Sequence, residues 1–195
     1  MKKQAQILVL LVLALVIVAV PMMVRFPIKF TYNASASAPI GFYRIRTASS
    51  LKRGAFAVVP TPPGFRMMAA KRHYLPYNVP LIKRIVALSG DEVCRHGETI
   101  FVNKKPVATA LTRDRQGRLL PVWQGCTLLK STRFFALMDA PDSFDGRYFA
   151  PLDTEDIVGI AVPIFTWVPD ADGVNTAVGN IQDREQEDGA KRKAR

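Results

Sequence analysis

The 195-residue sequence contains only two histidines, His73 and His96, and only two cysteines, Cys94 and Cys126. A triad of serine, histidine and aspartate needs a histidine base, and neither histidine lies in a recognisable nucleophile motif. A structural metal site usually takes four cysteine or histidine ligands, so the two cysteines with His96 would leave it short. Repeats and phosphate-binding glycine loops are also absent from the sequence. We therefore expect no metal and no cofactor, and a serine nucleophile would need a base other than histidine.

Acidic residues are absent before Asp91, whereas lysine and arginine occur thirteen times in that stretch. From Asp91 onward, 14 basic residues face 16 acidic ones, so the formal net charge of +11 resides in the first half of the chain. A basic half of this kind suits a nucleic acid or an anionic lipid surface. Its charges are scattered among apolar residues next to a hydrophobic segment, which favours lipid. We expect no direct nucleic-acid partner.

The hydrophobic segment, residues 7–24, is a run of 18 residues without a charge, closed by Arg25. At 1.5 Å per helical residue it spans roughly 27 Å, about the thickness of the hydrocarbon layer. A cleaved secretory signal is the alternative, and residues 34–36 resemble a cleavage site. The run is long for a signal core, and twelve residues separate its end from Ser37. We therefore expect a retained transmembrane anchor.

The two cysteines form an even pair, for which a disulfide is the better use. A bridge between Cys94 and Cys126 closes a loop of about 30 residues and could contribute roughly 3 to 4 kcal/mol. Such a bridge would place the domain outside the cytoplasm, whereas two buried free thiols are the alternative. We expect residues 1–6 in the cytoplasm, a single crossing of the bacterial inner membrane, and residues 25–168 in the periplasm.

Fourteen prolines and 12 glycines favour short strands and turns over long helices. The sequence predicts strands over 41–46, 55–59, 81–88, 134–138 and 157–165, a hairpin over 93–107 and a short helix over 65–75. Residues 94–130 form an inserted, mostly polar subregion tied by the cysteines. Residues 169–195 are too polar to bury, which predicts a disordered tail. The fold class is therefore mainly β.

Lys83 lies within an otherwise apolar run, residues 80–88, apart from its neighbour Arg84. On a strand, alternate side chains share a face, so Lys83 would join Leu81 and Ile85 while Arg84 points the other way. Bringing a lysine pKa from about 10.4 to near 7 disfavours the charged amine by roughly 4 kcal/mol, which burial in apolar surroundings can supply. The pattern predicts an amine base.

A serine in a small-residue loop, Ser37, is the candidate nucleophile for this base. Together with Lys83 it lies in four ordered blocks, which read NASASAPIGFY (33–43), LKRGAFAV (51–58), LIKRIVALSGDEVC (81–94) and DSFDGRYF (142–149). On these blocks the chain resembles the type I signal peptidase family over residues 33–165. Pro39 and Gly41 follow Ser37 at the spacing of its conjugative-transfer branch, the TraF-like peptidases. Three residues depart from the family pattern: Ala55 where the family often has aspartate, Ser89 where proline is usual, and Gly146 in place of a second serine.

The resemblance implies a signal-peptidase-like β-barrel or sheet domain with one N-terminal transmembrane helix. It implies that Ser37 is the nucleophile and that neutral Lys83 is the general base. Ser35 takes the place of a hydroxyl that helps the Ser37 amide to hold the oxyanion.

The last block adds three supporting residues by the same resemblance. Ser143 matches a residue that orients the lysine, and Asp145 matches one that structures the site with Arg147. The alternative for residues 143–147 is a plain turn before a strand, which an aspartate and a glycine would explain alone. The joint pattern of the four blocks favours the catalytic interpretation.

The function that the resemblance implies is a membrane-anchored serine endopeptidase that processes a conjugative pilin precursor through an acyl-enzyme. In some relatives the amino terminus of the pilin resolves this intermediate and closes a ring. The expected partners are the pilin precursor, inner-membrane lipid and other conjugative transfer proteins. Two alternatives are a general type I signal peptidase and a non-catalytic anchored subunit of a transfer apparatus, and a nucleic-acid-binding role is a third.

Overall fold

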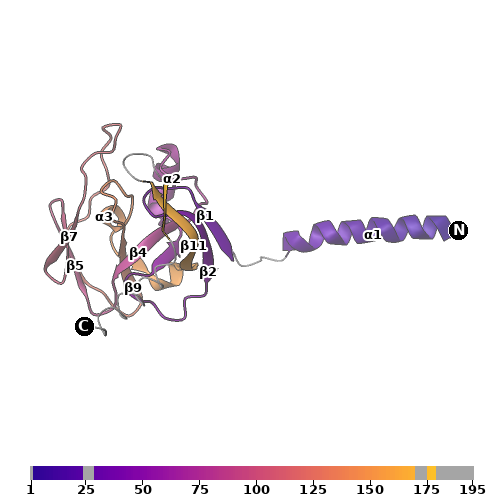
Figure 1. Cartoon of the computed structure of the whole chain (residues 1–195), viewed down its shortest axis with the longest axis horizontal. Coiled ribbons are helices and arrows are strands. Elements are labelled where there is room, and N and C mark those ends of the chain that lie inside the picture. Colours follow the sequence, from indigo (N-terminus) through magenta and orange to yellow (C-terminus); the bar gives the residue numbers. More distant parts are fainter. Residues whose placement is uncertain (1, 24–28, 170–174, 179–195) are drawn as a thin grey trace.

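The computed structural model describes residues 2–23, 29–169 and 175–178, and within them a long helix precedes a β-rich domain (Figure 1). The elements in chain order are α1 (Lys2–Met23), β1 (Phe30–Asn33), β2 (Ile40–Arg46), β3 (Phe56–Val59), α2 (Pro63–Lys71), β4 (Leu81–Ala87), β5 (Glu92–His96), β6 (Thr99–Val102), β7 (Lys105–Thr109), β8 (Gly125–Leu128), β9 (Arg133–Leu137), α3 (Gly146–Phe149), β10 (Leu152–Asp153), a 3-10 turn (Thr154–Asp156), β11 (Gly159–Pro169) and β12 (Asn175–Val178). The expectation of a mainly β domain is confirmed.

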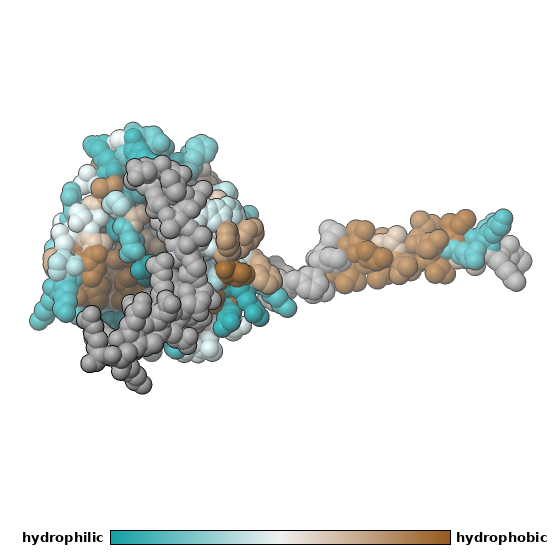
Figure 2. Space-filling model, viewed as in Figure 1, coloured by the Kyte–Doolittle hydropathy of each residue, from teal (hydrophilic) through white to brown (hydrophobic). Residues whose placement is uncertain are grey.

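Helix α1 is long and apolar enough to cross a membrane. Its segment Lys3–Val20 has a mean hydropathy of 2.4 and none of it is buried inside the protein. Figure 2 shows this apolar surface along the helix. The helix begins before the predicted span of 7–24, and residue 24 lies outside the described part of the chain. This helix is consistent with the expected membrane anchor.

The described strands form two antiparallel sheets. The larger has the strand order β1-β2-β11-β3-β4-β9-β10, with β12 added alongside β11. The smaller, in the order β7-β6-β5-β8, lies at the other end of the domain from β1 and β2 (Figure 1). All four strands of the smaller sheet come from residues 92–128, largely within the predicted subregion 94–130, and its neighbouring strands β5 and β8 are joined by the Cys94–Cys126 disulfide. The predicted disulfide is therefore present.

Strand β4 lies inside the larger sheet, between β3 and β9. Its run of apolar residues is bounded by Pro80 and by the turn at Gly90, which suits a strand buried on both faces. Leu81 and Ile85 pack into a core cluster with Ala57 and Phe134 of the neighbouring strands. The strand predicted over 81–88 is confirmed to within one residue, and the same position brings Lys83 into the interior.

Strand β11 crosses the larger sheet and pairs with β2, β3 and β12. Its register shifts between Pro163 and Phe165, next to the position where Thr166 faces Gly41 of β2. Gly41 has a φ of +141°, and a Cβ atom there would clash with the carbonyl oxygen of Phe165 and lie 2.8 Å from Thr166 Cα. Only glycine fits this close approach of two backbones.

Helix α2 is shorter than the sequence predicts. The sequence predicts a helix over 65–75, whereas α2 covers Pro63–Lys71. His73 adopts a φ of +58°, and the N–H of Tyr74 donates to the carbonyl oxygen of Ala69 at 2.9 Å. This left-handed residue and its 6→1 hydrogen bond are the usual signs of a helix C-terminus. His73 therefore ends the helix ahead of the prolines on which the prediction relied.

The C-terminal tail differs from its prediction at Pro169, which ends β11, and in one further segment. Asn175–Val178 form β12, with Asn175 opposite Pro169 and Val178 opposite Thr166 of β11. The prediction of disorder over 169–195 is wrong for these four residues, because backbone pairing does not require apolar side chains. The remainder of the tail, 170–174 and 179–195, lies outside the described residues.

Replacing Gly41 by alanine should destabilise the fold. We expect the Gly41→Ala variant to lose about 2 to 4 kcal/mol of unfolding free energy, because the new Cβ adds backbone strain to a clash. Urea unfolding of the purified chain measures the loss. Gly90→Ala is the matched control, since Gly90 has a φ of +88° but open space around its Cα. Equal losses in the two variants would contradict the role of the close approach.

Candidate active site

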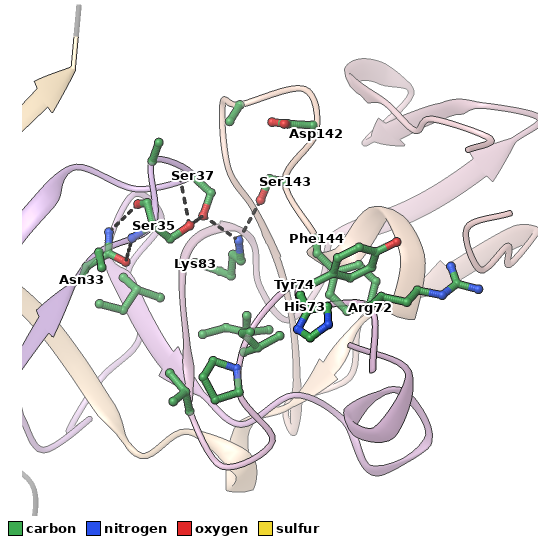
Figure 3. Close-up of a pocket in the computed structure, with 18 of the residues that line it drawn as sticks. Asn33, Ser35, Ser37, Arg72, His73, Tyr74, Lys83, Asp142, Ser143 and Phe144 are labelled. Atoms are coloured by element: carbon green, nitrogen blue, oxygen red, sulfur yellow. Dashed lines mark hydrogen bonds between the residues drawn. The ribbon is translucent and has the colours of Figure 1, made fainter. Parts of the chain in front are cut away.

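The candidate nucleophile lies in the short loop between β1 and β2. Ser37 occupies a turn in which the N–H of Ala38 donates to the carbonyl oxygen of Ser35 at 3.3 Å. Ser37 Oγ lies 3.0 Å from Ser35 Oγ and 3.3 Å from Lys83 Nζ (Figure 3). The structure thus brings together three residues that the sequence predicted to share one site.

Lys83 reaches this loop from the middle of the larger sheet. Its side chain is 3% exposed, and its strand partner on β3 is the small residue Ala57. Lys83 Nζ lies 2.7 Å from Ser143 Oγ and 3.3 Å from Ser37 Oγ, so it sits between two hydroxyls. A buried amine in this position can exchange a proton with either neighbour.

The surroundings of Lys83 disfavour its charged form. Burial lowers the pKa of Lys83 from the usual 10.5 to about 8, although the negative charges of Asp145 and Asp142 act in the opposite direction and Arg147 adds to the decrease. The direction agrees with the prediction from the strand pattern, and the size is smaller than the shift to near 7 that the sequence suggested. The reason is that two carboxylates lie close enough to favour the ammonium.

Ser143 is held by the segment between β9 and α3. Its side chain is buried, and its N–H donates to the carbonyl oxygen of Ala140 at 3.1 Å in a turn. Asp145 follows directly and begins α3, where its side chain accepts a hydrogen bond from the N–H of Arg147. The segment therefore leads into a short helix and not into a strand, unlike the plain alternative, and it points a hydroxyl at Lys83 Nζ.

Asp145 and Arg147 form a buried ion pair beside this turn. Arg147 Nη1 donates to Asp145 Oδ2 at 2.5 Å, and both side chains are almost fully buried. Asp145 also accepts from the N–H of Met138 at 3.0 Å, while Arg147 Nη2 donates to the carbonyl oxygen of Met138 at 2.8 Å. The pair therefore ties the residues that follow Ser143 to Met138, the residue directly after β9.

Gly146 departs from the family pattern, and packing explains why. A Cβ atom at this position would lie 2.5 Å from the ring of Phe135 and 2.7 Å from the carbonyl oxygen of Ala136. The helix α3 packs directly on β9 here, so a serine side chain does not fit without a shift of the backbone. The departure removes no atom from the group around Lys83.

A cavity of about 1080 Å³ runs past these residues. One part is lined by the loop that carries Ser35 and Ser37 and by Lys83, and the other reaches Arg72, Tyr74 and the 111–120 segment (Figure 3). In the far part, the Tyr74 hydroxyl donates a hydrogen bond to Asp114 at 2.6 Å, which joins the segment after α2 to the 111–120 segment. The volume of the cavity is at the upper end of the range for small-molecule sites, which leaves room for a peptide segment.

No pattern in the amino-acid sequence predicts the far wall of this cavity. Asp114 accepts from Arg118 Nε at 2.6 Å, and Arg115 pairs with Asp142, the residue before Ser143. These residues lie in the subregion that composition describes only as polar. Nothing in their spacing predicts that they fold back onto Asp142 and Tyr74, because these contacts join loops that are far apart in the sequence.

Cys94, His96 and Cys126 are the one group of possible metal ligands found among the described residues. Both sulfurs belong to the disulfide, which leaves only the His96 ring as a donor. Cys126 Sγ lies 3.7 Å from His96 Nε2. One ligand does not make a metal site, so this group cannot hold an ion while the bridge is intact.

The chain matches the family model of signal peptidase, peptidase S26, over residues 2–167. It therefore belongs to the S26 signal peptidase family of serine peptidases.

Within this family the chain is TraF-like, as the resemblance implied. The plasmid transfer protein TraF of Escherichia coli is 31% identical over 147 residues, covering 69% of this chain and 82% of that protein. The conjugal transfer protein TraF of Agrobacterium fabrum is 29% identical over 150 residues, covering 72% and 84%. A solved signal peptidase I from Enterococcus faecalis is 16% identical with a TM-score of 0.34, over 57% of this chain and 97% of that one. The assignment rests on the family match and the TraF relatives.

Breaking the buried ion pair should be more damaging than removing it. We expect Arg147→Met alone to lose about 3 to 5 kcal/mol of unfolding free energy, because it leaves the Asp145 carboxylate buried and uncompensated. The double variant with Asp145→Leu should lose less than the sum of the two single losses. Urea unfolding of the three variants measures the coupling free energy. Strictly additive losses would show that the two side chains act independently.

Proposed function

We propose that this protein is a membrane-anchored serine endopeptidase with a Ser37–Lys83 dyad that processes a conjugative pilin precursor. The observation that carries the proposal is the buried Lys83 amine, placed between the hydroxyls of Ser37 and Ser143. Membership of a serine peptidase family supports the reaction type. The names of the TraF relatives, which refer to plasmid and conjugal transfer, support the biological setting.

In the proposed first step, neutral Lys83 takes the proton of Ser37 Oγ as that oxygen attacks the scissile carbonyl carbon. The tetrahedral intermediate then collapses, the peptide C–N bond breaks, and the Lys83 ammonium returns its proton to the leaving amine. Ser143 accepts a hydrogen bond from the amine and limits its rotation. The product is an acyl-enzyme on Ser37.

The Ser37 N–H and the Ser35 hydroxyl are the proposed oxyanion donors. In the present arrangement the Ser37 N–H points at Ser35 Oγ, 3.4 Å away, and Ser35 Oγ also contacts Ser37 Oγ. Substrate binding must therefore turn the Ser35 hydroxyl toward the developing oxyanion. Donors placed in this way act on charge that appears in the transition state.

The second half of the proposed reaction needs a nucleophile that is deprotonated by Lys83. Water would give hydrolysis, and the amino terminus of the pilin would give a cyclic product. The groove that continues beyond Lys83 toward Tyr74 and the 111–120 segment offers room for a second chain segment. Either outcome uses the same Ser37 acyl-enzyme.

The proposed location is the periplasmic face of the bacterial inner membrane. A disulfide between Cys94 and Cys126 is expected to persist in an oxidising compartment. The apolar helix α1 would then anchor the chain with its first residues in the cytoplasm. Lipid, the pilin precursor and other transfer proteins are the proposed partners.

Loss of either dyad residue should abolish processing without loss of the fold. We expect Ser37→Ala and Lys83→Met to leave the pilin precursor uncut in mating cells, with at least about a 1,000-fold decrease in turnover. Mass spectrometry of the pilin measures its length and detects ring closure as the loss of one water. Ser89→Ala is the control, a serine on an exposed turn away from the groove. Normal pilin in both dyad variants would contradict the proposal.

Turnover should increase with pH through the Lys83 titration. Because the base must be neutral and burial lowers the pKa of Lys83 to about 8, kcat/KM should increase about tenfold from pH 6 to 7 and level off above about pH 9. A peptide that spans the processing site of the pilin measures the profile in detergent micelles. A flat profile between about pH 6 and 10 is incompatible with a lysine base.

A further inference from the structure

Asn33 lies at the end of β1, directly below the loop that carries the proposed nucleophile (Figure 3). Its Nδ2 lies within hydrogen-bonding distance of three backbone carbonyl oxygens, those of Ser35 at 2.8 Å, Ala38 at 3.1 Å and Pro39 at 3.1 Å. Its Oδ1 accepts from the N–H of Ser35 at 3.1 Å. One carboxamide thus contacts the backbone on both sides of Ser37.

The backbone of this loop offers little support of its own. Its turn closes through a long hydrogen bond from Ala38 to Ser35, at 3.3 Å, and Pro39 has no N–H to donate. The Tyr43 hydroxyl donates to the carbonyl oxygen of Pro39 at 2.6 Å, which fixes one end of the loop. Asn33 provides the contacts that reach the turn itself.

An ordinary local role explains only one of these four contacts. Asparagine and aspartate both accept a hydrogen bond from the N–H two residues later, which is a common turn geometry. The contact from Ser35 N–H to Asn33 Oδ1 is of this kind. The donations from Nδ2 go further, because only an amide has these donors. Aspartate at this position would keep the acceptor and set a carboxylate against three carbonyl oxygens.

We propose that Asn33 is a positioning residue that holds the turn of residues 35–38 so that Ser37 Oγ stays within reach of the Lys83 amine. This inference rests on the proposed role of Ser37 as nucleophile. The distance from Ser37 Oγ to Lys83 Nζ is 3.3 Å, close to the limit for a hydrogen bond, so a small displacement of the turn separates the pair. A misplacement of about 1 Å can decrease a rate about 100-fold.

The test compares Asn33 with Asn103, because the side-chain carboxamide of each residue both donates and accepts hydrogen bonds. Asn33→Asp and Asn33→Ala are assayed as the full chain in detergent micelles with p-nitrophenyl acetate, a small ester that does not need the peptide groove. Asn103→Asp is the matched control: the Asn103 carboxamide donates to Asp91 at 2.7 Å and accepts from the N–H of Glu92 at 2.9 Å, in the turn between β6 and β7. The rate of Ser37→Ala is subtracted as background.

We expect kcat to decrease about 100-fold in both Asn33 variants, with KM within about threefold of the wild type. Asn103→Asp should lose stability but keep its kcat per folded molecule. Values of kcat within about threefold of wild type in Asn33→Asp would overturn the inference. So would a loss of activity that only follows the loss of folded protein, as monitored by thermal unfolding of the same samples.

A pH profile of kcat distinguishes a displaced turn from a disturbed Lys83 base. Asn33→Ala introduces no charge and does not contact Lys83, so its kcat should level off at a lower value with an unchanged pH midpoint. A shifted midpoint would show that the variant disturbs Lys83 instead, which also overturns the inference. If the wild type has no rate above Ser37→Ala, the proposed function itself fails, and that result is distinct from all the others.

Discussion

The structure depends on burying one lysine amine next to a serine hydroxyl, in surroundings that disfavour its charged form. The pKa of Lys83 in the folded chain, about 8 as a result of burial, is below the 10.5 expected when the chain is unfolded. Between these values the unfolded chain binds the proton more readily, so the free energy of unfolding increases as the pH increases from 8 to 10.5. Below pH 8 the burial of this residue costs about 3 kcal/mol. A methionine would fill the same space without that cost, so stability alone does not account for a lysine here.

The rest of the fold can be understood from that constraint. A central strand with neighbours on both sides excludes water from Lys83, and the small side chain of Ala57 beside it leaves room for its long stem. The hydroxyl of Ser143 then has to meet the amine at a fixed distance, which the Asp145–Arg147 pair secures by tying its segment to Met138. The same ion pair places a carboxylate near the amine, and that charge limits how far the pKa decreases.

Sequence patterns predicted the strands whose burial follows a simple rule. The apolar run of β4 and the alternating residues of β2 were located to within one residue, because burial and turn residues bound them on both sides. Short elements such as β1 and β10 carry too few residues for a pattern to stand out. The end of α2 depends on a single left-handed residue, His73, and β12 depends on backbone pairing with β11. Neither feature produces a periodic pattern of apolar residues in the sequence.

The sequence predicted the proposed reacting residues of the candidate site but not the residues that support them. A lysine in an apolar strand is visible because it conflicts with its surroundings, and ordered blocks add Ser37, Ser35 and Ser143 to it. Asn33 conflicts with nothing, since asparagine beside a turn is ordinary, and its contacts with Ala38 and Pro39 need the chain to turn back as β1 and β2 pair. A residue that binds only backbone has no partner side chain to mark it in the sequence. The precision of such a site therefore resides in contacts that folding creates, and these must be read from the structure.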